Sequence, residues 1–251
     1  PELSRGLGDV YKRQMKYGLI GENLIHSFSQ DFFKKKFENL NLKKYQYQNF
    51  EIKNVHEIIN IINRNNLKGL NITIPFKSES LAIVDEIDEH AKNIGSINTL
   101  QISKKKIKGY NTDFIGFKNS IKPILEKRKN ALILGNGGSS KAIQYALRKL
   151  NINYKIVSRS GDLNYENLTE NDIISNKIII NTTPLGMYPN INDFPKIPYH
   201  VLSKEHLAYD LIYNPKETIF LKKAKEMECK VKNGFEMLKI QAEESWKIWN
   251  N

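Results

Sequence analysis

The sequence has only one cysteine and no long apolar segment. Cys229 has no second thiol to pair with, which excludes an intramolecular disulfide and suggests a reducing, cytoplasmic compartment. No apolar run approaches the roughly 20 residues that span a bilayer, so we expect no membrane protein. No Cys-His pattern surrounds Cys229, so we assign it no chemical role and expect no metal site.

An excess of basic side chains over acidic ones is the most unusual feature of the composition. The 39 Lys and Arg residues outnumber the 27 Asp and Glu residues, which gives a net charge of +12. The lysines are scattered, as at Lys34–Lys36 and Lys104–Lys106, and no basic stripe alternates with stacking aromatics. A general bias toward lysine explains the charge more simply than a nucleic-acid partner. A non-enzymatic nucleic-acid-binding protein is nevertheless the alternative from another class.

The first half of the chain reads as an α/β domain that begins after a short leader. Residues 1–14 carry no apolar pattern, and we expect a non-native or disordered segment. Residues 15–112 are predicted to form a parallel-rich substrate-binding domain. Its expected elements are strands at 17–21, 45–52 and 70–74, helices at 31–40, 55–65 and after Pro75, and a hairpin at 98–110.

The second half repeats the alternation of strands and helices. Residues 113–235 are predicted to form a Rossmann-like dinucleotide-binding domain. Its expected elements are helices at 114–126 and 139–150 and strands at 131–134, 154–157, 178–181 and 207–211. A last helix at 236–251, with Trp246 and Trp249, is expected to pack back on the first domain and complete it. The predicted fold class is therefore two-domain α/β.

A glycine-rich turn joins a buried strand to a helix in the second domain. The segment Gly135-Asn136-Gly137-Gly138-Ser139-Ser140 follows the apolar strand directly. Glycines allow the backbone to approach a pyrophosphate, and the helix N-terminus offers unpaired N–H groups. A turn of this kind can also exist without a ligand, but the strand, the spacing and the next strand favour a dinucleotide site.

The end of the following strand indicates which dinucleotide is bound. NAD enzymes usually place an acid there for the ribose 2′-hydroxyl. This chain has Ser158-Arg159-Ser160, with no acid in the segment and with an arginine that can pair with a 2′-phosphate. We therefore predict NADP(H), although Asp162 lies nearby and an exposed arginine can also be simple surface charge.

Polar residues follow the strands of the first domain as well. Thr73 and Lys77 flank Pro75 after one strand, and Asn98 and Asp113 stand at two further element ends. Ser27 and Ser29 precede or open a helix, where hydroxyls can bind a carboxylate; taken alone, Ser29 is most simply a helix N-cap.

These segments together resemble the shikimate dehydrogenase family from Tyr17 almost to the C-terminus. The matching segments are the Ser27/Ser29 loop, Asn71-x-Thr73-x-Pro75-Phe76-Lys77, Asn98-Thr99, Asn111-Thr112-Asp113, Gly135 to Ser140, Ser158-Arg159-Ser160, Asn181-Thr182-Thr183-Pro184-x-Gly186-Met187, Asp210-x-x-Tyr213 and Gly234-x-x-Met237-Leu238-x-x-Gln241. The order and spacing of these segments make chance agreement implausible.

The resemblance implies NADPH-dependent, reversible reduction of 3-dehydroshikimate to shikimate on the route to chorismate and the aromatic amino acids. It implies Lys77 and Asp113 as the catalytic pair. The implied substrate residues are Ser27, Ser29, Thr73, Lys77, Asn98, Asp113, Tyr213 and Gln241. The implied cofactor residues are Gly135, Asn136, Gly137, Gly138, Ser139, Ser140, Ser158, Arg159, Ser160, Thr182, Met187, Gly234 and Met237.

Three positions depart from the family pattern. Gln30 replaces a proline after the second serine, Asn136 replaces a small residue in the glycine turn, and Leu163 stands where NADP-preferring members carry a second basic residue. The last departure predicts weaker affinity for the 2′-phosphate. A quinate/shikimate dehydrogenase that uses NAD is the nearest alternative, although its usual acid at position 158 is absent. A catalytically silent sensor is a third alternative, which the presence of Lys77 and Asp113 disfavours.

The expected mechanism follows from carbonyl reduction. Hydride transfer leaves an alkoxide that needs a proton, and Lys77 is the better donor, with Asp113 to orient it. Tyr213 must approach Ser27 for both to hold the substrate carboxylate, so we expect domain closure. Either a monomer or a homodimer is consistent with the sequence.

Overall fold

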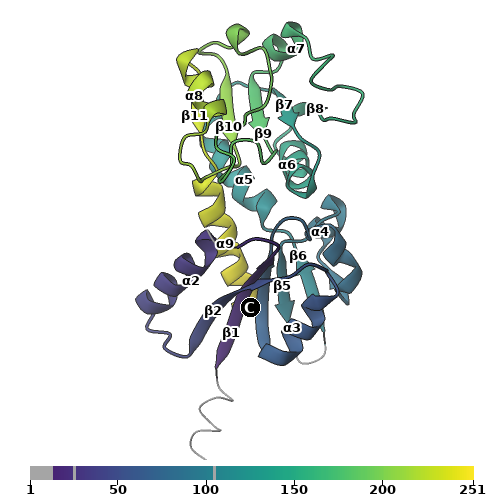
Figure 1. Cartoon of the computed structure of the whole chain (residues 1–251), viewed down its shortest axis with the longest axis vertical. Helices are drawn as coiled ribbons and strands as arrows, with labels where there is room; N and C mark the ends of the chain where they lie inside the picture. The colour runs from purple at the N-terminus through teal and green to yellow at the C-terminus, as the bar shows by residue number, and fades with distance from the viewer. Residues whose placement is uncertain (1–13, 25–26, 104–105) are drawn as a thin grey trace, which may run out of the picture. The chain divides into compact units, whose positions relative to one another are not determined.

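The computed structural model describes residues 14–24, 27–103 and 106–251 (Figure 1). The predicted leader, residues 1–14, lies outside the described residues except for Gln14, and so do Lys104 and Lys105. The chain divides into two compact units. The first unit runs to Thr112 and includes Ser245–Asn251, and the second covers Asp113–Glu244. The segment 236–244, which the sequence analysis grouped with the first domain, therefore clusters with the second unit.

The first unit is built on a mixed sheet of six strands in the order β2-β1-β3-β5-β6-β4. β1 is parallel to β2 and to β3, whereas β5 is antiparallel to β3 and to β6. The strands are β1 (Met15–Gly21), β2 (Tyr45–Glu51), β3 (Leu67–Ile72), β4 (Glu86–Ile87), β5 (Thr99–Ile102) and β6 (Ile107–Tyr110). The predicted strands and hairpin are present, and the two-residue strand β4 is an addition.

The helices of the first unit are α2 (Phe28–Asn39), α3 (Glu57–Asn65) and α4 (Glu89–Ile94). The helix predicted directly after Pro75 is wrong, because residues 74–78 form turns and only a short 3-10 helix follows at Glu79–Ile83. The physical reason is that the Lys77 carbonyl accepts a hydrogen bond from the Ile97 N–H (2.8 Å), which ties the turn to another segment.

Aromatic side chains fill one face of this sheet and aliphatic ones the other. On β1, Tyr17 stacks on Trp249 with ring centroids 4.8 Å apart, and Phe33 of α2 lies 5.2 Å from the same indole. Gly69 of β3 makes room for this indole, because a Cβ there would lie 2.3 Å from Trp249 Nε1. Ile20, on the opposite face of β1, belongs to an aliphatic core that includes Ile58 and Ile62 of α3. The end of the last helix is thus part of the first unit's core.

The second unit has a wholly parallel sheet of five strands in the order β11-β10-β9-β7-β8. The strands are β7 (Asn130–Leu134), β8 (Asn153–Val157), β9 (Ile178–Asn181), β10 (Leu207–Asp210) and β11 (Lys230–Lys232). The chain crosses from β8 past β7 to β9, so the strand order reverses between β7 and β9. Ligands of open parallel sheets bind at such a reversal, outside the carboxyl ends of the strands.

Helices cover both faces of this sheet, as Figure 1 shows. The helices are α5 (Asp113–Ile121), α6 (Gly138–Lys149), α7 (Glu170–Ser175), α8 (Ile219–Glu226) and α9 (Phe235–Asn250). Leu132 and Leu134 of β7 share a core with Phe220 of α8. On the opposite face, Tyr209 of β10 meets Phe117 of α5, with ring centroids 4.9 Å apart. The α5 helix is shorter than the predicted 114–126, since it gives way to a 3-10 turn at Lys122–Ile124.

Within the described part of the chain, no helix combines the length and the apolar character that crossing a membrane requires.

Candidate active site

The loop before α2 holds the two serines expected to bind a carboxylate. Ser27 is the N-cap residue of α2, with φ −71° and ψ 122°, but its side chain makes no capping hydrogen bond. Its Oγ is buried and has no hydrogen-bond partner among the described residues. Ser29 lies inside the first turn of the helix, so the interpretation of Ser29 as the N-cap is wrong. An unsatisfied buried hydroxyl costs free energy unless a ligand completes it.

A buried network of amides and hydroxyls links Ser29 to the middle of the sheet. Ser29 hydrogen bonds to the Tyr47 side chain, and the Tyr47 hydroxyl donates to Asn71 Oδ1 at 2.8 Å. Burial nevertheless raises the pKa of Tyr47 far above its ordinary value, so the phenol remains a neutral donor. The Asn71 amide nitrogen in turn donates to Ser245 Oγ at 2.9 Å. Ser29 is therefore held in place by residues of β2, β3 and α9.

Asn98 is the second centre of this network. Its Oδ1 accepts the backbone N–H of Thr112 at 2.7 Å, and its Nδ2 donates to Thr112 Oγ1 at 3.0 Å. Thr99 Oγ1 lies 2.8 Å from Ser245 Oγ. The network therefore joins the end of β3, the start of β5 and the segment after β6 to the C-terminal turns of α9, and it fixes the side chain of Asn98.

Thr73 and Lys77 lie just beyond the end of β3. The Thr73 N–H donates to the Ile20 carbonyl of β1 at 2.9 Å, and a Cβ on Gly21 would lie 2.5 Å from Thr73 Cγ2. The Ile97 N–H bonds to the Lys77 carbonyl, next to Asn98. The structure thus brings the first unit's predicted residues to one end of its sheet.

The remaining predicted substrate residues, Asp113, Tyr213 and Gln241, belong to the second unit. Asp113 is buried at the start of α5, and Gln241 lies on α9. Gly116 lets these two helices approach closely, since a Cβ there would lie 2.6 Å from the Met237 carbonyl and 3.2 Å from Gln241 Cβ. Asp113 and Gln241 therefore stand on neighbouring helices.

The glycine turn follows β7 as predicted and opens α6 at Gly138. Gly135 has φ +106°, a conformation that favours glycine, and a Cβ there would lie 2.8 Å from Thr182 Oγ1. Gly137 differs, because a Cβ there would meet no atom within 4 Å. The position in front of the α6 N-terminus therefore borders open space. Ser140 is fully buried, and its hydroxyl accepts a hydrogen bond from the Gln144 side-chain amide at 3.2 Å. The Ser140 side chain therefore makes a contact within α6.

Backbone hydrogen bonds tie the loops at this edge of the sheet together. The Gly135 N–H donates to the Val157 carbonyl at 2.8 Å, and the Thr182 N–H donates to the Leu134 carbonyl at 2.9 Å. Gly234 packs so closely on the loop after β10 that a Cβ would lie 2.0 Å from the Leu211 carbonyl oxygen. Met187 is exposed and Met237 is buried. Gly135, Thr182 and Gly234 therefore lie at the carboxyl ends of the parallel strands.

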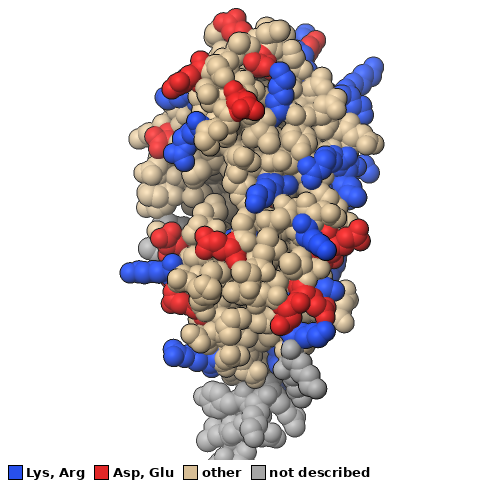
Figure 2. Space-filling view, turned by 90° about the vertical axis from the view of Figure 1, so that its right-hand side faces the viewer, with Lys and Arg blue, Asp and Glu red and all other residues tan. Residues whose placement is uncertain are grey.

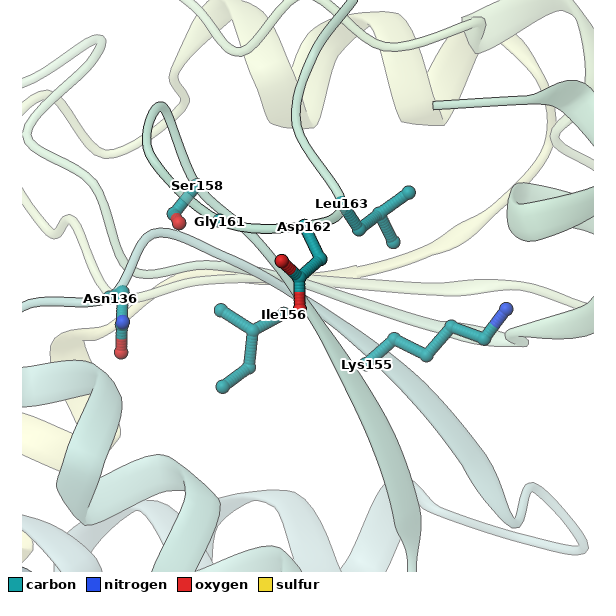
Figure 3. Close-up of a pocket in the computed structure, with 7 residues that line it drawn as sticks. All are labelled: Asn136, Lys155, Ile156, Ser158, Gly161, Asp162 and Leu163. Carbon is teal, nitrogen blue, oxygen red and sulfur yellow. The ribbon is translucent and has the colours of Figure 1, made fainter. Parts of the chain in front are cut away.

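A pocket of about 550 Å³ opens at the end of β8 (Figure 3). Ser158 lines it, whereas Arg159 and Ser160 are exposed and do not belong to its lining in the described part of the chain. The described lining residues are Asn136, Lys155, Ile156, Ser158, Gly161, Asp162 and Leu163. Asp162, noted from the sequence only as an acid near Arg159, is among these lining residues; no short motif marks it, because its place depends on how the loop after β8 folds.

A second residue that sequence reasoning left without a role is Asp210, at the end of β10. Its Oδ1 accepts from Asn181 Nδ2 (3.1 Å) and from the Ile212 N–H (3.0 Å), and its Oδ2 accepts from Thr218 Oγ1 (2.6 Å). Burial raises the pKa of Asp210 to about 6, against the lowering effect of these hydrogen bonds. Asp210 thus fixes the loop that carries Tyr213 and connects it to the loop after β9.

Charged side chains of both signs share the face of the molecule that Figure 2 shows. Acidic side chains lie among the basic ones on the face in Figure 2. Several described cations are paired with acids, as Lys155 is with Asp172 at 2.8 Å. Among the residues that the structure describes, no group of three or more His, Cys, Asp or Glu side chains is arranged to hold a metal ion.

Parallel strands, a glycine turn at the strand-order reversal and a pocket at the end of β8 define a dinucleotide-binding α/β protein of the oxidoreductase type. The family model described as the shikimate dehydrogenase substrate binding domain matches residues 19–100. A shikimate dehydrogenase (NADP(+)) from Methanococcus aeolicus is 41% identical over 92% of this chain and 90% of its own length.

Solved structures agree with this relationship. Shikimate dehydrogenase from Aquifex aeolicus has a TM-score of 0.86 at 35% identity and covers 95% of this chain and 93% of its own. The enzyme from Thermus thermophilus, in complex with NADP(H) and shikimate, has a TM-score of 0.83 at 26% identity and covers 94% and 93%. The chain belongs to the shikimate dehydrogenase family, and the predicted family and two-domain α/β fold class are confirmed.

Proposed function

We propose that this chain catalyses the reversible, NADP-dependent interconversion of 3-dehydroshikimate and shikimate. The observation that carries the proposal is the buried Ser27 hydroxyl, which has no partner among the described residues and stands beside the fixed Ser29. The carboxylate on the substrate ring would accept the hydrogen bond that this hydroxyl can donate. The names of the relatives support the same reaction and the same cofactor.

The bound nicotinamide supplies or accepts the hydride. Gly137, at the start of α6, would hold its pyrophosphate through backbone N–H groups, because the space before this glycine is open. Ser158 would contact the adenosine ribose, since it lines the pocket at the end of β8. Arg159 would pair with the 2′-phosphate from its exposed position.

Residues of the chain would donate the proton and bind the substrate. The ammonium group of Lys77 would donate a proton to the alkoxide that forms at the reduced carbonyl, and its charge would stabilise that oxyanion. Asp113 would orient Lys77 and accept a hydrogen bond from the neighbouring ring hydroxyl. The remaining hydroxyls would be bound by Thr73, Asn98 and Gln241.

Neutral donors would hold the carboxylate. Ser27 would donate its hydroxyl and Tyr213 its phenol, and Ser29 would donate its own hydroxyl by exchanging its hydrogen bond to Tyr47 for one to the carboxylate. Each such bond contributes about 0.5 to 1.5 kcal/mol net, so the carboxylate site would be moderately tight.

Two finer statements extend this proposal. We propose a cytoplasmic location, which the single free Cys229 supports. We also propose that substrate and cofactor are the only ligands the reaction needs, in a monomer or a homodimer.

The test is an absorbance assay at the nicotinamide band with shikimate or quinate, each paired with NADP or NAD. The proposal expects the fastest turnover with shikimate and NADP. Faster turnover with quinate and NAD would assign the chain to the alternative dehydrogenase class, and no absorbance change with any pair would refute an oxidoreductase. A salt-dependent retention on heparin together with no nicotinamide signal would favour a nucleic-acid-binding protein.

A further inference from the structure

The pocket at the end of β8 contains a carboxylate in the region where the proposed function needs to accept a 2′-phosphate. Asp162 lines this pocket, and Figure 3 draws its carboxylate between the side chains of Ile156 and Leu163. Arg159, the cation expected to receive that phosphate, is exposed and is not among the described lining residues. Asp162 is exposed as well, so the two residues differ in that the acid lines the pocket and the base does not, within the described part of the chain.

The loop that carries Asp162 is folded back on itself. The Ser158 N–H donates to the Leu163 carbonyl at 3.1 Å, and the absence of a side chain at Gly161 allows a close approach, since a Cβ there would lie 2.6 Å from Ser158 Oγ. The Asp162 carbonyl accepts a hydrogen bond from Asn167 Nδ2 at 2.7 Å. These contacts hold the backbone on both sides of Asp162, and none of them uses its carboxylate.

No described cation forms an ion pair with the Asp162 carboxylate. Lys155 is the other charged residue of the described lining, and its Nζ is paired with Asp172 at 2.8 Å. In Figure 3 the Lys155 side chain extends away from Asp162. No ion pair to Asp162 exists among the described residues. A 2′-phosphate in this pocket would therefore meet an uncompensated negative charge.

We propose that Asp162 is a specificity-determining residue that reduces the preference for NADP over NAD. The inference rests on the proposed function. An acid near the end of the second strand of a dinucleotide-binding unit accepts a hydrogen bond from the ribose 2′-hydroxyl of NAD, whereas a base there favours the phosphate of NADP. This chain has both kinds of group in one loop, so Asp162 opposes the phosphate that Arg159 attracts and offers an acceptor to the hydroxyl that replaces it.

The test compares Asp162→Asn with the wild-type chain by isothermal titration calorimetry, with NADP and NAD as separate ligands. Removal of the charge is expected to raise the ratio of the NAD to the NADP dissociation constant about three- to tenfold, the size expected for one partly screened charge near a phosphate. The gain in NADP affinity should shrink in high salt, because exposed charges are screened.

Glu166→Gln is the matched control, because it removes the same charge from an exposed residue of the same loop that is outside the described lining. It should leave the ratio unchanged. An equal change in both variants would mean a general charge effect and would overturn the inference. An unchanged ratio in Asp162→Asn, with NADP binding intact, would overturn it too, whereas a wild-type chain that binds neither dinucleotide would refute the proposed function itself.

Discussion

Asp210 makes a pH-dependent contribution to stability that can be separated from the rest of the protein. The residue is fully buried and accepts three hydrogen bonds, from Asn181, Ile212 and Thr218. Burial raises the pKa of this carboxyl from 3.8 to about 6. The folded state therefore binds its proton more tightly than the unfolded state does.

The direction of the effect follows from this difference in proton binding. A raised carboxyl pKa adds stability that is fully present below the unfolded pKa of 3.8 and is lost as the pH rises through about 6. From about pH 4.5 to about pH 7.5, this one group should lower the free energy of unfolding by about 2 kcal/mol.

Asp210→Asn should remove this pH dependence while it keeps an acceptor for Asn181 and Ile212. Thr218 Oγ1 can adapt to the new amide, because a hydroxyl both donates and accepts. The measurement is urea unfolding of both proteins at several pH values within this range. The free energy of unfolding of the wild-type chain should fall by about 2 kcal/mol relative to that of the variant as the pH rises.

Asp210→Ala provides the contrast, because it leaves three buried donors without an acceptor. It should lower the free energy of unfolding by about 3 kcal/mol or more near neutral pH. Thr218→Ser, which preserves the hydroxyl, is the control and should leave the pH dependence of the wild type. If wild type and Asp210→Asn keep the same difference in stability at every pH, then Asp210 does not titrate in this range and the reasoning is wrong.

Three further predictions concern the proposed reaction. Lys77→Ala should reduce turnover about a hundredfold or more, with little change in shikimate affinity, and unchanged steady-state rates would remove Lys77 from the catalytic role. Arg159→Ala should raise the Michaelis constant for NADP and leave that for NAD nearly unchanged; an equal rise for both would indicate a structural role. Joint replacement of Ser27 and Ser29 by alanine should weaken shikimate binding by about one to two powers of ten while NADP binding persists, and calorimetry with each ligand decides this.

The parts of the fold that the sequence predicted are those governed by local pattern. The buried strand before Gly135 and the turn after it were recognisable because an apolar run, glycines and a helix start follow one another directly. The hairpin of β5 and β6 was recognisable for the same reason. In both places the determining residues are neighbours in the chain.

Long-range contacts explain what the sequence did not predict. The helix expected after Pro75 is replaced by turns because the Lys77 carbonyl bonds to Ile97, in a segment beyond β4 and α4. Ser245 lies next to Asn71 although the two residues are 174 positions apart. Tyr47 lies between Ser29 and Asn71, and no motif marks it. Such partners become visible only when the sheet has brought its strands together.

Polar residues near strand ends therefore fall into two groups: those whose side chains are hydrogen bonded within the fold and those whose side chains are not. Asn71 and Asp210 satisfy buried donors and acceptors where the sheet ladders stop, so their first effect is on stability. The Ser27 hydroxyl is buried without such a partner among the described residues, although it stands at the start of a helix where a cap would be expected. The cost of burying an unsatisfied hydroxyl is recovered only when a ligand supplies the missing acceptor. Replacement of Ser27 by alanine should consequently lower substrate affinity rather than stability, whereas replacement of Asp210 by alanine should lower stability first.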